Sequence, residues 1–171
     1  YSSDDGVKFP FFGKRYSSMV FAANGYITFQ EMDSDGDENF PSLAAHFALP
    51  RISFLFADLA PVISGIAWAR ELSDRLVVTF EEVPEYIYAN DFSSPLPNSV
   101  QVELFHSGHI RFTYKELNAK RAVVGLSDGQ GVPVNPRDLF EDLRNVNFYN
   151  NLSALPQAPT RLSIDPVAVQ R

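Results

Sequence analysis

The sequence contains no cysteine among its 171 residues. This absence excludes disulfide bonds, thiolate metal sites and cysteine nucleophiles. Methionine is also scarce, with two residues, whereas phenylalanine and tyrosine contribute 15 and 7. Aromatic and β-branched side chains suit the half-buried faces of a pleated sheet, so the composition favours β structure.

Basic residues and long apolar runs are scarce as well. Lysine and arginine number 14 against 21 aspartate and glutamate residues, which gives a net charge of −7. Without a basic cluster to neutralise phosphate, we expect no nucleic-acid partner.

The longest apolar run is far shorter than the roughly 20 residues that cross a bilayer, and no signal-peptide pattern opens the chain, so we expect no membrane insertion by this domain. Because the chain begins with Tyr1, we expect a fragment of a longer protein.

Short alternating apolar runs separated by turn residues fill most of the chain. Asn24-Gly25 lies between "SMVFA" and "YITFQ" and predicts a hairpin with strands at 18–22 and 26–30, because both turn residues tolerate positive φ. Further strands are predicted in "RISFLFA", "GIAWAR", "DRLVVTFEEVP", "SVQVELF", "HIRFTYKEL" and "AVVGLS". The connections are too short for crossover helices, so the strands should pair antiparallel.

These patterns predict an all-β fold, an antiparallel β-sandwich of about nine to ten short strands with at most one short helix. The helical pattern is "NPRDLFEDLR", where Asn135 would cap the helix and Pro136 would take its first position. We predict that residues 1–150 form a single domain. Residues 151–171 contain three prolines and are predicted to be a linker or a terminal extended segment.

Five blocks of the sequence, taken in order, resemble the β-rich modules of nidogen and of plexin-domain-containing surface proteins. They are "FPFFGKRYSSMVFAANGYITF", "HFALPRISFLFADLAP", "DRLVVTFEEVPEY", "NSVQVELFHSGHIRFTYKEL" and "VVGLSDGQGVP". The match spans about residues 7–133 and resembles still more closely the modules repeated in large exported bacterial multidomain proteins. The resemblance implies a non-catalytic extracellular or cell-surface module, structural or adhesive, that binds neighbouring domains or other protein subunits of a surface assembly. It supplies no catalytic residues and no defined ligand.

The residues themselves also favour a protein that is not an enzyme. "GLSDG", residues 125–129, fits the letters of a Gly-x-Ser-x-Gly nucleophile elbow around Ser127, but the "QGVPVNP" that follows cannot begin the helix that an elbow requires. His106 and His109 flank a predicted hairpin turn, where two side chains would not converge reliably on zinc. We therefore predict no catalytic residues and no cofactor, with calcium as the one alternative.

The calcium hypothesis comes from "EMDSDGDENF", in which Asp33, Asp35 and Asp37 alternate around a glycine. An EF-hand loop would need glycine at the sixth position and glutamate at the twelfth, and this loop has neither, so an EF-hand is excluded. A looser oxygen site shared with Asp58 competes with a solvated acidic turn. Asp58 interrupts an apolar run, so its carboxylate is expected either to hydrogen-bond structurally or to bind the metal.

Aromatic residues in a long polar loop define an alternative function. Tyr86, Tyr88 and Phe92 lie where exposed rings could stack on sugars, which with the acidic loop suggests a calcium-assisted carbohydrate-binding, lectin-like module with glycans as partners. The competing interpretation, which we favour, buries Trp68 in the core and places the tyrosines over a sheet edge. Asn151 begins an Asn-Leu-Ser sequon, a glycosylation site only if the protein is secreted by a eukaryotic cell.

Overall fold

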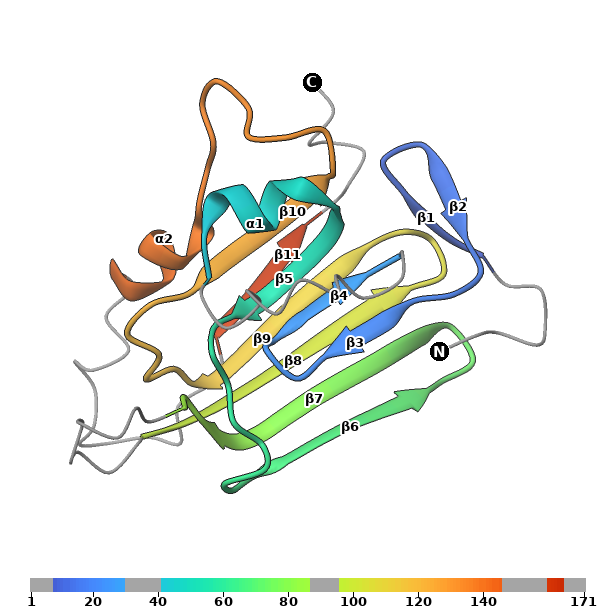
Figure 1. The fold of residues 1–171 in the computed structure, drawn as a ribbon. Helices are drawn as coiled ribbons and strands as arrows, with labels where there is room; N and C mark the ends of the chain where they lie inside the picture. The colour runs from blue at the N-terminus through green and yellow to red at the C-terminus, as the bar shows by residue number, and fades with distance from the viewer. Residues whose placement is uncertain (1–7, 30–40, 87–95, 146–159, 165–171) are drawn as a thin grey trace.

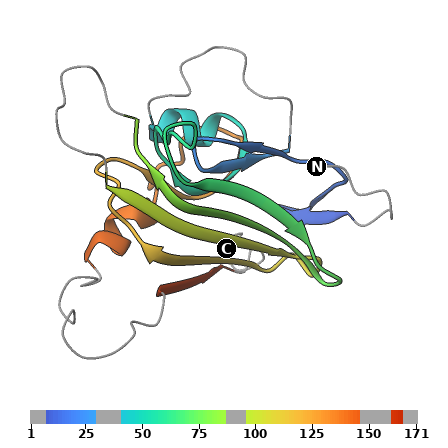
Figure 2. The same cartoon turned by 90° about the horizontal axis from the view of Figure 1, so that it is seen from below.

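The computed structural model describes residues 8–29, 41–86, 96–145 and 160–164, the last of these for their backbone only (Figure 1). In these residues the strands form three antiparallel sheets, of two, four and five strands. The four-stranded and five-stranded sheets pack face to face around a shared hydrophobic core, and Figure 2 shows them as two layers. The predicted all-β sandwich is confirmed.

The four-stranded sheet has the order β10-β5-β4-β3, and the five-stranded sheet has the order β11-β9-β8-β7-β6. A small separate sheet pairs β1 with β2. The strand bounds are β1 (Phe9–Phe11), β2 (Lys14–Tyr16), β3 (Val20–Ala22), β4 (Tyr26–Thr28), β5 (Pro50–Phe56), β6 (Ile66–Glu71), β7 (Arg75–Pro84), β8 (Pro97–Phe105), β9 (Ile110–Glu116), β10 (Val123–Asp128) and β11 (Thr160–Ile164).

The predicted Asn24-Gly25 turn joins β3 to β4. Gly25 has a φ of +77°, and a Cβ at this position would overlap the carbonyl oxygen of Leu55. The Gly25 carbonyl accepts hydrogen bonds from the N–H groups of Phe54 and Leu55, at 3.2 and 3.0 Å, because β5 bulges at these two residues. Both the positive φ and the close approach of β5 require glycine here.

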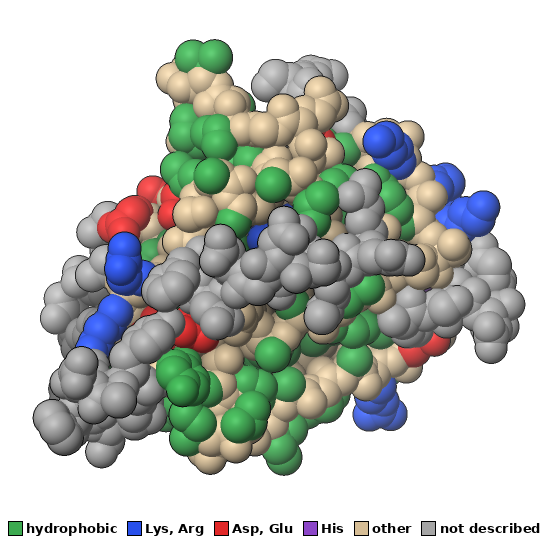
Figure 3. Space-filling model, viewed as in Figure 1, with side chains coloured by type: hydrophobic (Ala, Val, Ile, Leu, Met, Phe, Trp, Pro, Cys, Tyr) green, Lys and Arg blue, Asp and Glu red, His purple; other side chains and the backbone are tan. Residues whose placement is uncertain are grey.

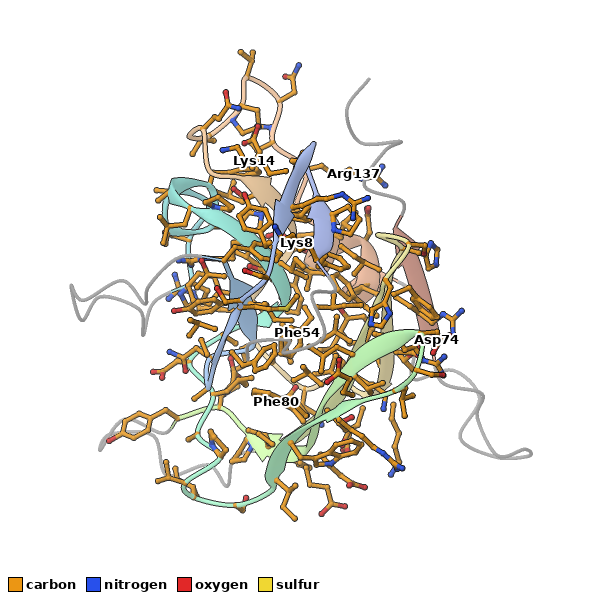
Figure 4. All side chains as sticks on the ribbon, turned by 90° about the vertical axis from the view of Figure 1, so that its right-hand side faces the viewer. Lys8, Lys14, Phe54, Asp74, Phe80 and Arg137 are labelled. Atoms are coloured by element: carbon orange, nitrogen blue, oxygen red, sulfur yellow. The ribbon has the colours of Figure 1, made fainter. Side chains whose placement is uncertain are left out.

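Strand β5 is the centre of the core, as its two-faced apolar pattern predicts, and all seven of its residues are buried. The Phe54 ring meets the Phe80 ring of β7 edge to face, with 5.2 Å between the centroids (Figure 4). Tyr114 of β9 is fully buried, and its hydroxyl donates a hydrogen bond to the Phe54 carbonyl at 2.6 Å. A residue of one sheet therefore satisfies the backbone of the other across the core.

The structure has two short helices where at most one was expected. Helix α1 (Leu43–Ala48) lies over β5 and β10 (Figure 1) and was not predicted. Its N-cap is Ser42, whose side chain accepts a hydrogen bond from the Ala45 N–H at 3.1 Å. The run "SLAAHFA" thus contains a capping signal that we overlooked beside the stronger strand pattern that follows it.

The predicted helix near the C-terminal end is present but begins later than expected. Helix α2 spans Leu139–Asn145. Asp138, and not Asn135, supplies the cap, because its Oδ1 accepts a hydrogen bond from the Phe140 N–H at 2.9 Å. In the described part of the chain, neither helix has the length and apolar character needed to cross a bilayer.

Strand β11 adds a last strand to the five-stranded sheet, beside β9. It lies within the segment 151–171 that we predicted to be a linker or an extended segment. The domain boundary at residue 150 stays a prediction.

Candidate interaction surface

Strand β6 presents apolar side chains to solvent. It is the last strand in the order of the five-stranded sheet, and all six of its residues are exposed. Ile66 is 60% exposed and Trp68 is 40% exposed. Ala67 and Ala69, which point to the opposite face, are exposed as well. The expectation that Trp68 is a core residue is therefore wrong, because neither face of this edge strand is buried by a second layer.

The loop before β6 continues this apolar surface. Val62 is 91% exposed and Ile63 is 50% exposed. We call Val62, Ile63, Ile66 and Trp68 the edge patch. In Figure 3, hydrophobic side chains gather along the lower part of the molecule, where this loop and β6 lie. Contiguous exposed apolar residues are uncommon on isolated domains and indicate an interaction surface.

A sharp turn and a bulge fix the point where β6 begins. Gly65 has a φ of +83°, and a Cβ there would lie 2.6 Å from the carbonyl oxygen of Glu82. Glu82 has a φ of 56° at a bulge between Phe80 and Val83 in β7. Its N–H donates a hydrogen bond to the Ser99 hydroxyl at 3.0 Å, which holds the bulge against β8. A bulge bends its strand and increases the local twist, so this bulge determines the direction in which β6 runs along β7.

An ion network stiffens the outer face of the sheet to which β6 attaches. The buried carboxylate of Glu103 lies 3.0 Å from Arg75 Nε and 3.2 Å from Arg111 Nη1. The Arg75 N–H is not aimed at the carboxylate, so this contact is an ion pair, whereas Arg111 donates a hydrogen bond. Both guanidinium groups also lie over the Phe105 ring, 5.1 Å from its centroid. These contacts tie β7, β8 and β9 together.

A serine–histidine pair joins α1, which contains His46, to β5, which contains Ser53. His46 Nδ1 is 2.8 Å from Ser53 Oγ, and both residues are buried. Burial lowers the pKa of His46 to about 4, against the raising effect of a hydrogen bond to the Leu126 backbone, and the nearby charge of Arg51 also lowers it. The imidazole is therefore neutral at pH 7. Because a substrate has no access to either side chain, the pair acts by satisfying buried polar atoms.

The Gly-x-Ser-x-Gly pattern is a strand end, as predicted. Ser127 lies in β10 and is buried, and its hydroxyl accepts a hydrogen bond from the Gly129 N–H at 3.0 Å. Gly129 and Gly131 have φ values of +81° and +90° and form the turn that follows. A nucleophile elbow would expose its serine at the start of a helix, whereas Ser127 is buried and is followed by a turn.

Two of the predicted ligand residues, Asp58 and Tyr86, lie side by side. The Tyr86 N–H donates a hydrogen bond to the Asp58 carbonyl at 2.7 Å. Asp58 is half-buried just beyond the end of β5, and Tyr86 is 51% exposed. The remaining predicted site residues lie outside the described residues, namely Asp33, Asp35, Asp37, Tyr88, Phe92 and Asn151.

Trp68 and Tyr86 do not share one stacking surface. Trp68 is paired with Thr79 in the middle of β7, and the strand continues for five more residues to Pro84 before it reaches Tyr86. At the ordinary rise of a strand, that stretch corresponds to roughly 16 Å.

Within the described ranges, no three His, Asp or Glu side chains are grouped so that they could hold a metal ion. His106 and His109 flank the turn between β8 and β9, and the His109 ring packs on Phe105 with 5.5 Å between the centroids. The calcium site in the acidic loop stays a prediction.

The family comparison decides the classification. A family model described as NIDO related matches residues 4–163. The chain belongs to the NIDO-related family. The match extends beyond residues 7–133, which carried the resemblance, and it takes in all of β11 except its last residue. No curated protein matches the chain, and no solved structure matches it. The chain is thus a nidogen-like module, and its place in a bacterial multidomain protein stays a prediction.

The edge patch is the feature of this NIDO-related domain that the sequence analysis missed. The run "GIAWARE" carries no local signal of this exposure, because large apolar residues on one face and alanines on the other fit a central strand as well as an edge strand.

Proposed function

We propose that this NIDO-related domain is a non-catalytic extracellular or cell-surface module with a structural or adhesive role in a larger protein or assembly. The observation that carries the proposal is the family match over residues 4–163. The partners we propose are neighbouring domains or other protein subunits, and the surface that contacts them is the edge patch.

The chemistry of the edge patch supports a protein partner. Ile66 and Trp68 form an exposed apolar centre, and Arg70 and Glu71 lie next to it on the same strand. An apolar centre with an aromatic anchor and a charged rim is the usual composition of a protein–protein interface. The fixed course of β6 along β7 supports the same conclusion, because a rigid surface loses little conformational entropy on binding.

The buried polar groups support a non-catalytic role. Catalytic groups need access to substrate and a pKa suited to proton transfer. His46 has neither property, since it is buried and its pKa is about 4. The Ser127 hydroxyl is buried in a strand.

Adhesion by the edge patch is tested with beads coated with the domain. We expect the beads to bind cells or matrix, and the double variant Ile66→Ala, Trp68→Ala to lose that binding. The control is Val132→Ala, Val134→Ala, which removes two exposed apolar side chains from the turn after β10. Equal adhesion by both variants would contradict a role for the edge patch.

Localisation needs a separate test. Intact cells that produce the protein are treated with an amine-reactive label that does not cross membranes. Labelling of the exposed Lys14 without lysis would support an extracellular position. Labelling that appears only after lysis would contradict it.

A second candidate function is the lectin-like module, because Tyr86 offers an exposed aromatic ring beside Asp58. A glycan array probed with and without a calcium chelator tests it directly. Calcium-dependent binding that is lost in Tyr86→Ala would favour this function over the first. A blank array would leave the structural or adhesive role.

A further inference from the structure

We propose that the outer face of the five-stranded sheet binds an acidic polysaccharide, a chain of uronic acid residues that lies across strands β6 to β9. The outer face is the one turned away from the four-stranded sheet (Figure 2). The inference goes beyond the proposed function, because the ligand is a glycan and not a protein. It also differs from the lectin-like candidate, because it involves neither Tyr86 nor calcium.

Four side chains form a row across this face, one from each strand. They are Trp68 of β6, Thr79 of β7, Gln101 of β8 and Thr113 of β9, and each is paired with the next in the strand register. Residues directly opposite each other in an antiparallel pair share one face of the sheet. Neighbouring strands are about 4.8 Å apart, so the row measures roughly 14 Å from its first residue to its last. One side chain per strand is close to one side chain per sugar ring of an extended polysaccharide.

The polar side chains of the row are arranged for hydrogen bonds to a ligand. Gln101 Nε2 donates a hydrogen bond to the Thr79 hydroxyl at 2.9 Å, which orients both side chains. Among the described residues, Gln101 Oε1 and the Thr113 hydroxyl have no hydrogen-bond partner, and neither atom is buried. Both atoms therefore reach the surface, where the hydroxyl groups of a sugar can bond to them.

Trp68 supplies an aromatic surface at one end of the row, and its side chain is 40% exposed. A sugar ring packs the C–H groups of its apolar face against an aromatic ring, and the indole offers the largest such surface. Extended peptides, in contrast, are usually bound at strand edges or in apolar grooves. A polar row with one aromatic ring at its end therefore favours a polysaccharide over a peptide.

The charges on this face favour an acidic chain. In β6 to β9, the charged side chains of the outer face are Arg70, Arg75, Arg111 and Lys115 against Glu81 and Glu103. Four positive and two negative charges leave the face with a net charge of +2, in a chain whose net charge is −7. Glu103 pairs with Arg75 and Arg111, whereas Arg70 and Lys115 are exposed on opposite sides of the row. The carboxylates of uronic acid residues can pair with these two exposed cations.

NMR titration of the isotope-labelled whole chain tests the site. The probes are a mannuronate hexasaccharide, a galacturonate hexasaccharide and mannohexaose, which is the neutral match of the first. We expect the backbone amide signals of the four residues in the row and the indole N–H signal of Trp68 to shift with at least one acidic probe. A calcium chelator should not change these shifts. Mannohexaose should bind at least about tenfold more weakly than the mannuronate probe, because it has no carboxylates to pair with Arg70 and Lys115.

Two charge variants and a matched control locate the binding site. Gln101→Glu keeps the size of the side chain but places a carboxylate in the middle of the row, so it should weaken binding of the acidic probe by at least about tenfold. Arg70→Ala should weaken it by about fivefold or more. The control Arg121→Ala removes the same charge from the connection between β9 and β10, and it should leave the affinity unchanged.

The absence of shifts with both acidic probes would overturn the inference, and so would equal affinities for the mannuronate probe and mannohexaose. Binding that requires calcium, or that is lost in Tyr86→Ala, would also overturn it and would support the lectin-like candidate. These results are distinct from a failure of the proposed function, because Gln101→Glu leaves the edge patch intact and adhesion is measured separately on the coated beads. Binding of an acidic probe by a domain whose beads do not adhere would support the inference and count against the adhesive role.

Discussion

Acidification from pH 7 to pH 4 is expected to destabilise the domain through His46. The ordinary pKa of histidine is 6.5, and burial on the inner side of α1 lowers the pKa of His46 to about 4. Between these two values, the unfolded chain binds more protons than the folded chain, so the free energy of unfolding falls as the pH falls. This contribution is fully present above pH 6.5 and is lost as the pH falls to about 4.

The interval between the two pKa values sets the size of the effect. At about 1.4 kcal/mol per pKa unit, it corresponds to about 3 kcal/mol. This is a large fraction of the stability of a typical domain, which is about 5–15 kcal/mol. The cause is that a charged imidazole would be buried, close to the positive charge of Arg51.

Urea unfolding at a series of pH values, for the wild-type chain and for His46→Gln, isolates this effect. Carboxylates titrate in both proteins, so their effect on the free energy of unfolding largely cancels when the two pH profiles are compared. The variant should be less stable at pH 7, and its disadvantage should shrink by about 3 kcal/mol by pH 4. Parallel pH profiles would refute the reasoning. NMR titration of the His46 ring gives an independent check, since a midpoint near 6.5 would also refute it.

Three further predictions concern stability and calcium. Gly25→Ala should cost several kcal/mol or prevent folding, because any Cβ would overlap the Leu55 carbonyl; a wild-type thermal melt would count against this. Tyr114→Phe should lower the free energy of unfolding by about 1–2 kcal/mol in urea titrations, since a β5 carbonyl loses its donor inside the core; an unchanged midpoint would disagree. Calcium should raise the melting temperature of the wild-type chain but not of Asp33→Asn, Asp35→Asn, and no shift in the wild type would end the calcium hypothesis.

Local patterns were enough to predict most of the strands. The Asn24-Gly25 turn, the two-faced apolar run of β5 and the alternation in β7 each depend on residues within a few positions of one another. Turn chemistry and side-chain period act at that range. For the same reason, Ser127 could be assigned to a strand end.

The features that escaped prediction depend on contacts far apart in the chain. Whether Trp68 is buried depends on the position of β6 at the end of the sheet, and the run "GIAWARE" is compatible with a central or an edge strand. Arg51 is buried between the rings of Tyr26 and Phe56, 4.2 and 5.1 Å from their centroids, although an isolated arginine in a strand pattern suggests exposure. These placements follow from the order of strands, which local periodicity does not determine.

Adhesion of beads coated with the domain measures the role of the edge patch most directly. The double variant Ile66→Ala, Trp68→Ala should lose binding to cells or matrix, because it removes the exposed apolar centre of the patch, while the control Val132→Ala, Val134→Ala should keep it. Equal adhesion by the two variants would contradict the role of the edge patch.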